Sequence, residues 1–290
     1  MGEFETLYVP NSICWNITSK CNERCEFCYR DNISEDLEFD VNKKILDKII
    51  ASGVKKITFA GGEPLMYKGV LELIKYAKKN GVITSLTTNS ILLSDELLLQ
   101  LDGVLDWITL SLDAHNGELQ TKMTRNKNHF DNVLRILDTI NKNNLSMKIK
   151  INTIVSKINK DEVKHMIDII NKYNIYRWKL FQFIPLRGSA EINIDKFYIS
   201  DDDFLKVKNE IMIKDDMTKN KIITFTDRNS LESSYFVIFP NGDVRISTDL
   251  KDTLVGNLIK DDIREIWKNT CFEKNSHHNR TIKTIDASTL

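Results

Sequence analysis

Residues 12–28, SICWNITSKCNERCEFC, combine an alternating run with three closely spaced cysteines. Residues 12–18 alternate apolar and polar side chains, a pattern typical of a β-strand. The loop directly after this run contains Cys21, Cys25 and Cys28 in a C-x3-C-x2-C spacing. Three thiolates at this spacing can bind three corners of an iron–sulfur cubane and leave the fourth iron open to an external ligand. The stretch therefore predicts a strand followed by a [4Fe–4S] site.

Strand-like and helix-like runs alternate beyond this stretch. Further strands are expected at 55–60, 81–88, 107–112, 147–155 and 177–184. Helices are expected at 41–52, at 69–79, from Ser94 onward, at 129–143 and at 160–172. Such alternation predicts parallel βαβ units. Six units are too few to close the eight-unit barrel, so the expected fold class is α/β, with an open, partial (βα)6 TIM-type barrel.

The pattern changes after Ile184. We expect a loop at 185–198, a helix at 201–213, a β-hairpin in SYFVIF-PNGD-VRIS (234–247) and a short helix at 261–269. Asn241-Gly242 is the turn signal of the hairpin. These elements divide the chain into a barrel core at 10–200, a C-terminal extension at 201–272 that closes the barrel, and a mobile tail at 273–290.

Composition limits the classes of partner. The 290 residues contain 41 Lys and Arg and 41 Asp and Glu, so the net charge is zero. A neutral chain has no broad electrostatic footprint for nucleic acid or an anionic membrane. We find no apolar run that could span a bilayer and no secretory signal at the N-terminus. We therefore expect a cytoplasmic protein without nucleic-acid or membrane partners, in which clustered cysteines indicate metal binding or catalysis rather than disulfides.

A structural zinc site is the alternative explanation for the three cysteines. Zinc in structural sites usually takes four ligands with paired spacing. Cys14 lies within the first expected strand, ahead of the loop, and all five histidines are remote from the loop: His115, His129, His165, His277 and His278. This shortage of a fourth ligand favours the iron–sulfur interpretation.

A second motif, Gly61-Gly62-Glu63-Pro64, follows the second expected strand. Two glycines let backbone approach a ligand closely, and a carboxylate suits an ammonium group. Together with the cysteine loop, this motif resembles the radical S-adenosylmethionine (SAM) superfamily, whose GGEP segment binds the SAM amino group. The resemblance implies a [4Fe–4S] cluster on Cys21, Cys25 and Cys28 and SAM as the second cofactor. It also implies reductive cleavage of SAM to a 5′-deoxyadenosyl radical, and an electron donor such as flavodoxin or ferredoxin.

The resemblance extends to further SAM contacts. It implies that Tyr29 lies along the adenine, that Asn89 holds SAM, that Ser111 contacts a ribose hydroxyl, and that Arg125 binds the SAM carboxylate. Asp113 ends the same strand as Ser111 and is included in the set. These residues come at or beyond the carboxyl ends of expected strands, where α/β folds bind ligands. Each could instead be a polar loop residue with a local hydrogen bond.

The second half resembles the viperin branch of the superfamily, which converts CTP into its 3′-deoxy-3′,4′-didehydro analogue. The matching segments are KITFAGGEP (56–64), RNKNHFDNV (125–133), KINTIVSKINKDE (150–162), RWKLFQF (177–183), FYISDDDF (197–204) and SSYFVIFPNGD (233–243). The resemblance implies that Lys56 and Lys179 bind nucleotide phosphates and that Tyr235 delivers a hydrogen atom. Lys56 could instead be a surface lysine, and Tyr235 a core aromatic. An unpaired buried charge is costly, so Lys179, between Trp178 and Leu180, should face a cavity or a partner.

The chain also departs from viperins. Cys14 stands where they carry an asparagine that contacts the nucleotide, and Ala60 where they carry a serine. VGNLIKDDIREIW (255–267) resembles the endings of other small radical SAM proteins, including peptide modifiers. Arg187 is a candidate replacement anion contact. Cys271 is either a hydrogen donor or an inert buried thiol.

Three hypotheses follow. The first is a radical SAM enzyme that dehydrates a nucleoside triphosphate. The second is a single-cluster radical SAM enzyme that modifies a peptide or a small metabolite such as a sugar or antibiotic precursor. The third is a non-catalytic zinc or iron–sulfur protein, for which the GGEP motif would be accidental.

Overall fold

The computed structural model describes residues 9–30, 35–123, 126–214, 222–231, 235–248, 251–270, 277, 281 and 285. The strands are β1 (Ser12–Thr18), β2 (Lys56–Gly61), β3 (Ile83–Thr88), β4 (Trp107–Ser111), β5 (Lys148–Val155), β6 (Ile175–Gln182), β7 (Ile222–Thr226), β8 (Val237–Ile238), β9 (Asp243–Thr248) and β10 (Lys251–Asn257). The helices are α1 (Phe39–Ser52), α2 (Val70–Lys79), α3 (Asp95–Gln100), α4 (Gly117–Met123), α5 (His129–Lys142), α6 (Met166–Lys172), α7 (Gly188–Ile192), α8 (Ile194–Phe197), α9 (Asp201–Lys214) and α10 (Ile263–Asn269). None of the helices in these ranges has the length and apolar character needed to cross a bilayer.

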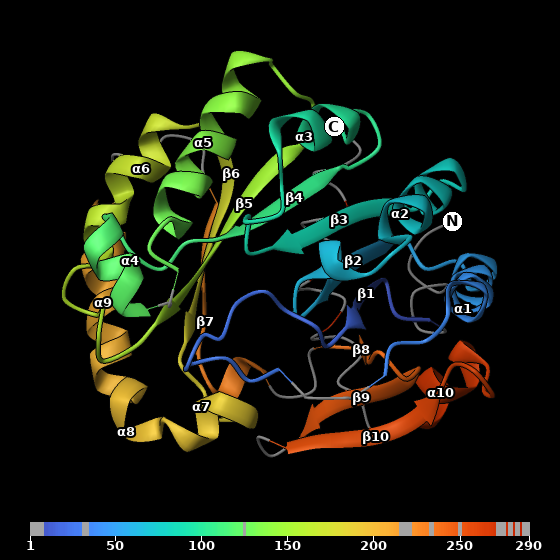
Figure 1. The fold of residues 1–290 in the computed structure, drawn as a ribbon. Helices are drawn as coiled ribbons and strands as arrows, with labels where there is room; N and C mark the ends of the chain where they lie inside the picture. Colours follow the sequence, from blue (N-terminus) through green and yellow to red (C-terminus); the bar gives the residue numbers. More distant parts are fainter. Residues whose placement is uncertain are drawn as a thin grey trace.

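The strands of the described residues form a single curved sheet with the order β10-β9-β8-β1-β2-β3-β4-β5-β6-β7. Strands β1 to β7 run parallel, and β8 pairs parallel with β1 before β9 and β10 continue antiparallel. Figure 1 shows the sheet curving with helices on its outer side. Strands β10 and β7 are its two edges, so the barrel is open. The expected α/β class and partial barrel are confirmed.

Alternation along the strands decides which side chains face the barrel interior. On β5, Ile149 and Ile151 are buried in the core, whereas Lys150 and Asn152 line an internal cavity. On β1, the fully buried Trp15 alternates with Cys14 and Asn16, which line the same cavity. Successive side chains of a strand point to opposite faces of the sheet. Every second residue therefore packs under the helices, and the residues between them are available to a ligand.

The helices bury apolar stripes against the outer face of the sheet. In α1 the buried residues include Ile45, Leu46 and Ile49, which recur at the helical period. The helix ends where Gly53 adopts a positive φ of 91°, a conformation that glycine adopts without steric cost. Ser94 caps α3 by accepting a hydrogen bond from Leu97 N (3.1 Å). The helix start expected at Ser94 is thereby confirmed.

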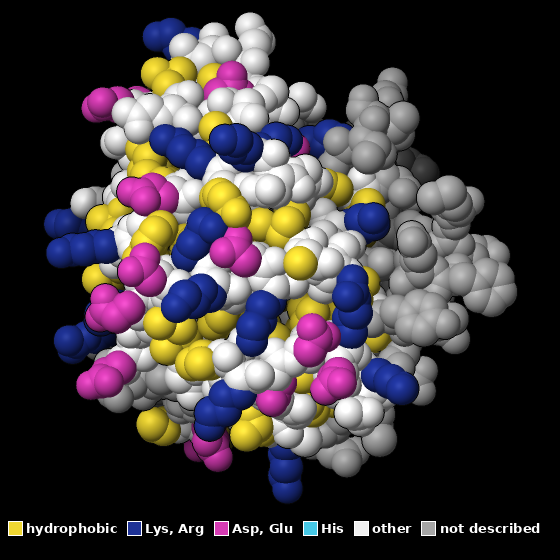
Figure 2. All heavy atoms as spheres, turned by 90° about the vertical axis from the view of Figure 1, so that its right-hand side faces the viewer, with side chains coloured by type: hydrophobic (Ala, Val, Ile, Leu, Met, Phe, Trp, Pro, Cys, Tyr) yellow, Lys and Arg dark blue, Asp and Glu magenta, His cyan; other side chains and the backbone are white. Residues whose placement is uncertain are grey.

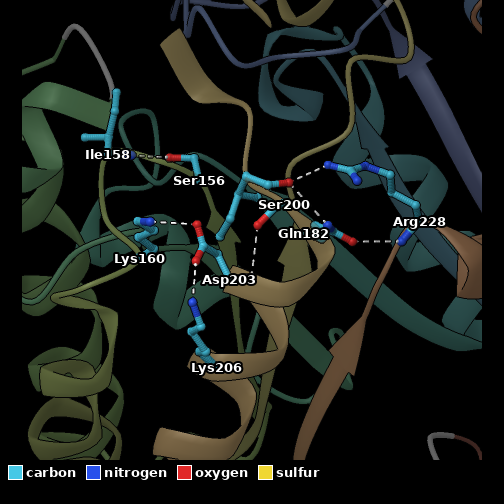
Figure 3. Close-up of polar contacts among 9 residues, drawn as sticks. Ser156, Ile158, Lys160, Gln182, Ser200, Asp203, Lys206 and Arg228 are labelled. Carbon is cyan, nitrogen blue, oxygen red and sulfur yellow. Dashed lines mark hydrogen bonds and ion pairs between the residues drawn. The ribbon is translucent and has the colours of Figure 1, made fainter. Parts of the chain in front are cut away.

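A seventh parallel strand, β7, extends the six that the sequence predicted. A polar network at the start of α9 and the end of β7 holds these elements in place (Figure 3). Arg228 N donates to Gln182 Oε1 on β6 (3.2 Å). Asp203 N donates to Ser200 Oγ (3.1 Å), and the Asp203 carboxylate accepts from Lys160 Nζ (2.7 Å). The helix expected at 201–213 is thus the crossover between two parallel strands.

Strands β8, β9 and β10 add to the opposite edge of the sheet, beside β1. The expected hairpin is present as β8 and β9, with Gly242 at a φ of 83° in its turn. The sequence did not predict β10, which pairs with β9. The loop expected at 185–198 contains the short helices α7 and α8, which corrects that assignment. The boundary at residue 200 between core and extension stays a prediction.

The predicted tail is described at three residues, two of which are buried. His277 packs its ring edge-on against Trp267, with centroids 5.3 Å apart, and accepts from Ser12 N (3.5 Å). Thr281 Oγ1 donates to His277 O (2.9 Å). Both residues line the internal cavity. They bring part of the C-terminal segment to the amino-terminal end of β1.

The outer surface mixes charges of both signs. Figure 2 shows the face that lies on the right-hand side of Figure 1, where Lys and Arg side chains are interspersed with Asp and Glu. Ion pairs such as Lys43–Asp47 on α1 (2.9 Å) belong to this mixed pattern. On the described part of this face, charges of both signs are therefore interspersed (Figure 2).

Candidate functional site

The inner face of the sheet surrounds a cavity of about 440 Å³. Cys21, Cys25 and Cys28 line it beside the carboxyl ends of the strands, and Lys56 and Lys179 line it from within β2 and β6. The carboxyl ends of parallel strands are the usual ligand edge of this architecture. The cavity thus joins the predicted cofactor residues to the predicted substrate residues.

The cysteine loop follows β1 and turns back on itself. Cys28 N donates to Cys25 O (3.1 Å), and Glu23 N donates to Cys21 Sγ (3.4 Å). All three thiols are half-buried, and burial raises the pKa of each of them. Burial disfavours thiolates that lack a counter-charge, and a bound cation deprotonates a coordinating thiol. Iron is therefore a suitable partner for this loop.

The donor set fits three corners of a [4Fe–4S] cluster. Within the described ranges, no three Cys, His, Asp or Glu side chains converge on one point as ligands of a single metal ion do. In a cubane each iron takes one thiolate, so the thiols need not converge. When bound, such a cluster supplies the electron that cleaves SAM into methionine and a 5′-deoxyadenosyl radical.

The GGEP segment positions the start of the cysteine loop. The amides of Gly62 and Glu63 donate to Thr18 O and Lys20 O, both at 2.8 Å. A Cβ on Gly61 would lie 2.3 Å from Thr18 O, and one on Gly62 would lie 2.2 Å from Lys20 O. Only residues without a side chain allow the two backbones this approach. Both glycines also line the cavity, as expected for backbone that meets a ligand.

Glu63 is fully buried (0% exposed) and points towards β3. Its carboxylate accepts from Leu65 N (3.2 Å), Thr88 Oγ1 (2.9 Å) and Asn89 N (2.8 Å). Burial raises the pKa of this carboxyl, and these donors oppose the rise. The described geometry gives Glu63 a positioning role between β2 and β3. Pro64, the last residue of the motif, is buried and begins a 3₁₀ turn. Contact of Glu63 with the SAM ammonium stays a prediction.

Asn89 links the end of β3 to the cysteine loop. Its amide Nδ2 donates to Asn22 Oδ1 (2.7 Å) and to Cys21 Sγ (3.6 Å), while its Oδ1 accepts from Ile91 N (3.1 Å). Asn89 also lines the cavity. This brings it to the predicted SAM site, beside the first cysteine.

Ser111 at the end of β4 and Asp113 just beyond it line the cavity, together with His129 at the start of α5. Burial raises the pKa of Asp113 to about 7, although Ile154 N donates to Asp113 Oδ1 (2.7 Å). His129 Nε2 lies 2.9 Å from Ser111 O, and burial lowers the pKa of the imidazole. His129 was not predicted as a site residue. The signal that could have identified it is its position at the first residue of the helix expected at 129–143, next to the end of a strand.

Arg187 and Tyr29 lie together at the cavity wall. The Arg187 guanidinium pairs with Asp252 on β10 and stacks over the rings of Tyr29 (5.3 Å) and Phe239 (5.4 Å). Tyr29 is 42% exposed and lines the cavity, as its predicted place along the adenine requires. Arg187 was expected to bind a substrate anion. In the structure it holds a carboxylate of the extension, so an anion would have to share or displace that partner.

Four cations line the cavity from the strands: Lys56, Lys150, Arg177 and Lys179. Lys56 is 6% exposed and lies over the Trp107 ring (4.5 Å). Burial, with help from nearby Arg177 and Lys148, lowers the pKa of Lys56 to about 7. Two of the four cations, Lys56 and Lys179, were predicted from the sequence. Lys150 and Arg177 were missed, although each stands two positions along its strand from a cavity-facing polar residue, Asn152 and Lys179.

Tyr235 contacts Lys179 directly. Lys179 Nζ donates to the phenol oxygen of Tyr235 (2.7 Å) and lies over the Phe181 ring (4.5 Å). Both Lys179 and Tyr235 line the cavity. The predicted phosphate contact and the predicted hydrogen donor are therefore neighbours, and their roles stay predictions.

The positions that differ from viperins face the same space. Cys14 and Ala60 line the cavity from β1 and β2. Two predicted site residues, Arg125 and Cys271, lie outside the described residues.

Comparisons with known proteins place the chain. The Radical SAM superfamily model matches residues 15–170. An S-adenosylmethionine-dependent nucleotide dehydratase from Flammeovirga pacifica is 33% identical over 243 residues, which cover 80% of both chains. A GTP 3′,8-cyclase from Clostridium perfringens (strain SM101 / Type A) is 27% identical over 302 residues, 93% of this chain and 92% of the cyclase.

A solved structure shares the fold of this chain. Streptococcus suis SuiB bound to its precursor peptide SuiA superposes with a TM-score of 0.74 at 18% identity, covering 93% of this chain and 67% of SuiB. At that identity the likeness shows the fold alone. The family match spans more than half of the chain and includes all three cysteines of the loop. The chain belongs to the radical SAM superfamily, whose enzymes use SAM and a [4Fe–4S] cluster.

Proposed function

We propose that this radical SAM enzyme acts on a nucleoside triphosphate and dehydrates its ribose. One observation carries the proposal: Lys56, Lys150, Arg177 and Lys179 line the same cavity as the three cysteines. Lysine and arginine bind phosphate oxygens through charge-assisted hydrogen bonds. A polyphosphate held by these cations would place the attached ribose between them and the cofactor end of the cavity.

The burial of these cations supports an anionic occupant. Lys56, Arg177 and Lys179 are 6%, 9% and 5% exposed. Buried charges of one sign repel each other and lose hydration, so an opposite charge stabilises them. The described acidic residues that line the cavity are Glu23 in the cysteine loop, Asp113 just beyond β4 and Asp252 on β10, so none of them stands on the strands that carry the four cations. A triphosphate would bring negative charge to these cations.

The relatives support the same substrate class. The Flammeovirga protein is named a nucleotide dehydratase, and the Clostridium protein is named for GTP. The dehydratase aligns over 80% of this chain. Cys14 and Ala60 line the cavity. These two positions, where the chain departs from viperins, would therefore contribute to selecting the nucleotide.

The reaction would balance as follows. The nucleotide loses one molecule of water, and SAM with two electrons and one proton becomes methionine and 5′-deoxyadenosine. In this scheme Tyr235, which accepts a hydrogen bond from Lys179 (2.7 Å), is the group that the chain offers for hydrogen transfer at the ribose. Lys179 would orient the phenol and hold a phosphate oxygen.

The test is anaerobic turnover with dithionite, SAM and each of ATP, CTP, GTP and UTP, following 5′-deoxyadenosine by mass spectrometry. One nucleotide should stimulate release at least about tenfold and appear as a product lighter by one water. No stimulation by any of the four would refute the proposal. Nucleotide-independent cleavage together with deuterium transfer from a labelled peptide or metabolite would instead establish the second hypothesis.

A matched pair of variants locates the binding site. Lys179→Met should raise the KM for the nucleotide about tenfold or more, the effect of losing one charge-assisted contact. Lys142→Met removes the same charge from an exposed position at the end of α5 and should leave KM unchanged. Equal effects of the two variants would contradict binding at the cationic end of the cavity.

A further inference from the structure

Glu23 places a carboxylate inside the cysteine loop. It stands between Cys21 and Cys25, is 5% exposed and lines the cavity. The C-x3-C-x2-C spacing does not itself require an acid at this position, because the cysteines are the cluster ligands. A buried carboxylate beside three thiols adds negative charge where the loop already concentrates it, so it needs a compensating partner.

One oxygen of Glu23 has no such partner among the residues that the structure describes. Asn126 hydrogen-bonds the carboxylate, whereas Oε1 is buried and accepts no hydrogen bond from any described residue. Leaving a buried acceptor unsatisfied costs free energy, and more so for a charged group. Since Glu23 lines the cavity, a donor or cation held there can reach this oxygen.

The identity of the occupant follows from the position. Glu23 lies within two residues of Cys21 and Cys25 in sequence, and its charge acts on the Cys25 thiol. Its bonded partner Asn126 directly follows Arg125, the residue expected at the SAM carboxylate. Both neighbours indicate the methionine end of SAM. That end carries the positive charge of the molecule, at the sulfonium and the ammonium.

We propose that Glu23 is a specificity-determining residue for SAM, whose carboxylate faces the cationic methionine end and favours the sulfonium over a neutral thioether. The inference rests on membership of the radical SAM superfamily and is independent of the nucleotide proposal. S-adenosylhomocysteine is the matching neutral ligand, because it lacks only the methyl group and the charge. Sinefungin replaces the sulfonium by a carbon bearing an amine and so restores a positive charge nearby.

The experiment measures binding rather than turnover. Protein with a fully loaded oxidised cluster is titrated anaerobically with SAM, S-adenosylhomocysteine and sinefungin by calorimetry. Glu23→Gln, which keeps the shape and removes the charge, should weaken SAM about tenfold to a hundredfold and change S-adenosylhomocysteine by less than about twofold. Equal weakening of both ligands, or none, would overturn the proposal.

A matched control uses the other acid of the same loop. Glu26 pairs with Lys196 on α8 and is not among the residues that line the cavity. Glu26→Gln should therefore leave the ratio of the dissociation constants for SAM and S-adenosylhomocysteine unchanged. If this ratio shifted as it does in Glu23→Gln, a specific contact of Glu23 with SAM would be rejected.

The wild type alone keeps the idea falsifiable if Glu23→Gln loads no cluster. It should bind SAM and sinefungin at least about tenfold more tightly than S-adenosylhomocysteine. Similar dissociation constants for all three ligands would show that no carboxylate in the site distinguishes a positively charged ligand from a neutral one.

Discussion

Lys56→Met is the substitution whose consequence follows most directly from the structure. Lys56 is almost fully buried at the start of β2 and lines the cavity. Arg177 and Lys148 lie close enough to lower its pKa further, while Asp106 acts in the opposite direction. Methionine has a similar length and no charge, so it isolates the electrostatic contribution of the ammonium group.

The pKa of about 7 sets the size and the sign of the effect. The ordinary lysine pKa is 10.5, so between these two pH values the unfolded chain binds more protons than the folded chain. The stability contributed by this group therefore rises from about pH 7 to pH 10.5 and is lowest below pH 7. The full difference corresponds to about 5 kcal/mol. Contact with the Trp107 ring stabilises the charged form and offsets part of this free energy. We therefore expect the charge of Lys56 to destabilise the fold by about 2–4 kcal/mol.

Urea denaturation of protein with equal cluster content, followed by far-UV circular dichroism at several pH values, measures this directly. At pH 6.5, Lys56→Met should be more stable than wild type by about 2–4 kcal/mol, and the gain should shrink towards zero near pH 10. Lys44→Met, at an exposed position of α1, should change stability by less than about 0.5 kcal/mol at every pH. A loss of stability at pH 6.5, or a pH-independent difference, would refute the reasoning.

Three further substitutions test the cofactor end. Cys25→Ser should abolish the visible absorption and iron content of the cluster while far-UV circular dichroism persists, and full iron content would exclude Cys25 as a ligand. Gly62→Ala should lower the cluster content, because the new Cβ would lie 2.2 Å from Lys20 O. The control Gly81→Ala adds only backbone strain, since its Cβ meets no atom within 4 Å, and should leave the cluster content unchanged. Equal iron losses in the two variants would contradict this prediction. Glu63→Gln should reduce the free energy of unfolding by about 1.5–3 kcal/mol in urea, because an amide cannot accept from three donors at once; an unchanged midpoint would show that these contacts do not stabilise the fold.

The sequence predicted the elements whose signal is local. The cysteine spacing, the GGEP segment after β2 and the turn at Asn241-Gly242 are each encoded within a few residues, and the structure places them as expected. The cost of burying an unpaired charge also predicted that Lys179 faces a cavity or a partner, and Lys179 does line the cavity. β7 and β10 were missed because both are edge strands with little burial, so alternation is weak in them.

Contacts between distant segments were decided by the tertiary structure. Arg187 resembles an anion contact in sequence, yet it pairs with Asp252 because the extension folds back beside the cavity. Glu63 reaches the end of β3 instead of facing the cavity, because Thr88 and Asn89 offer donors there.

By itself, the sequence determined that this chain forms parallel βα units around a three-cysteine cluster loop, because residue period and ligand spacing are local properties of a chain. The tertiary structure decided which cations meet in one cavity and which carboxylates are left to a ligand. Lys56, Lys150 and Arg177 come from three different strands, and their proximity depends on strand order and register. The same is true of Glu23, whose carboxylate is hydrogen-bonded by Asn126 from far along the chain while its Oε1 has no partner among the described residues.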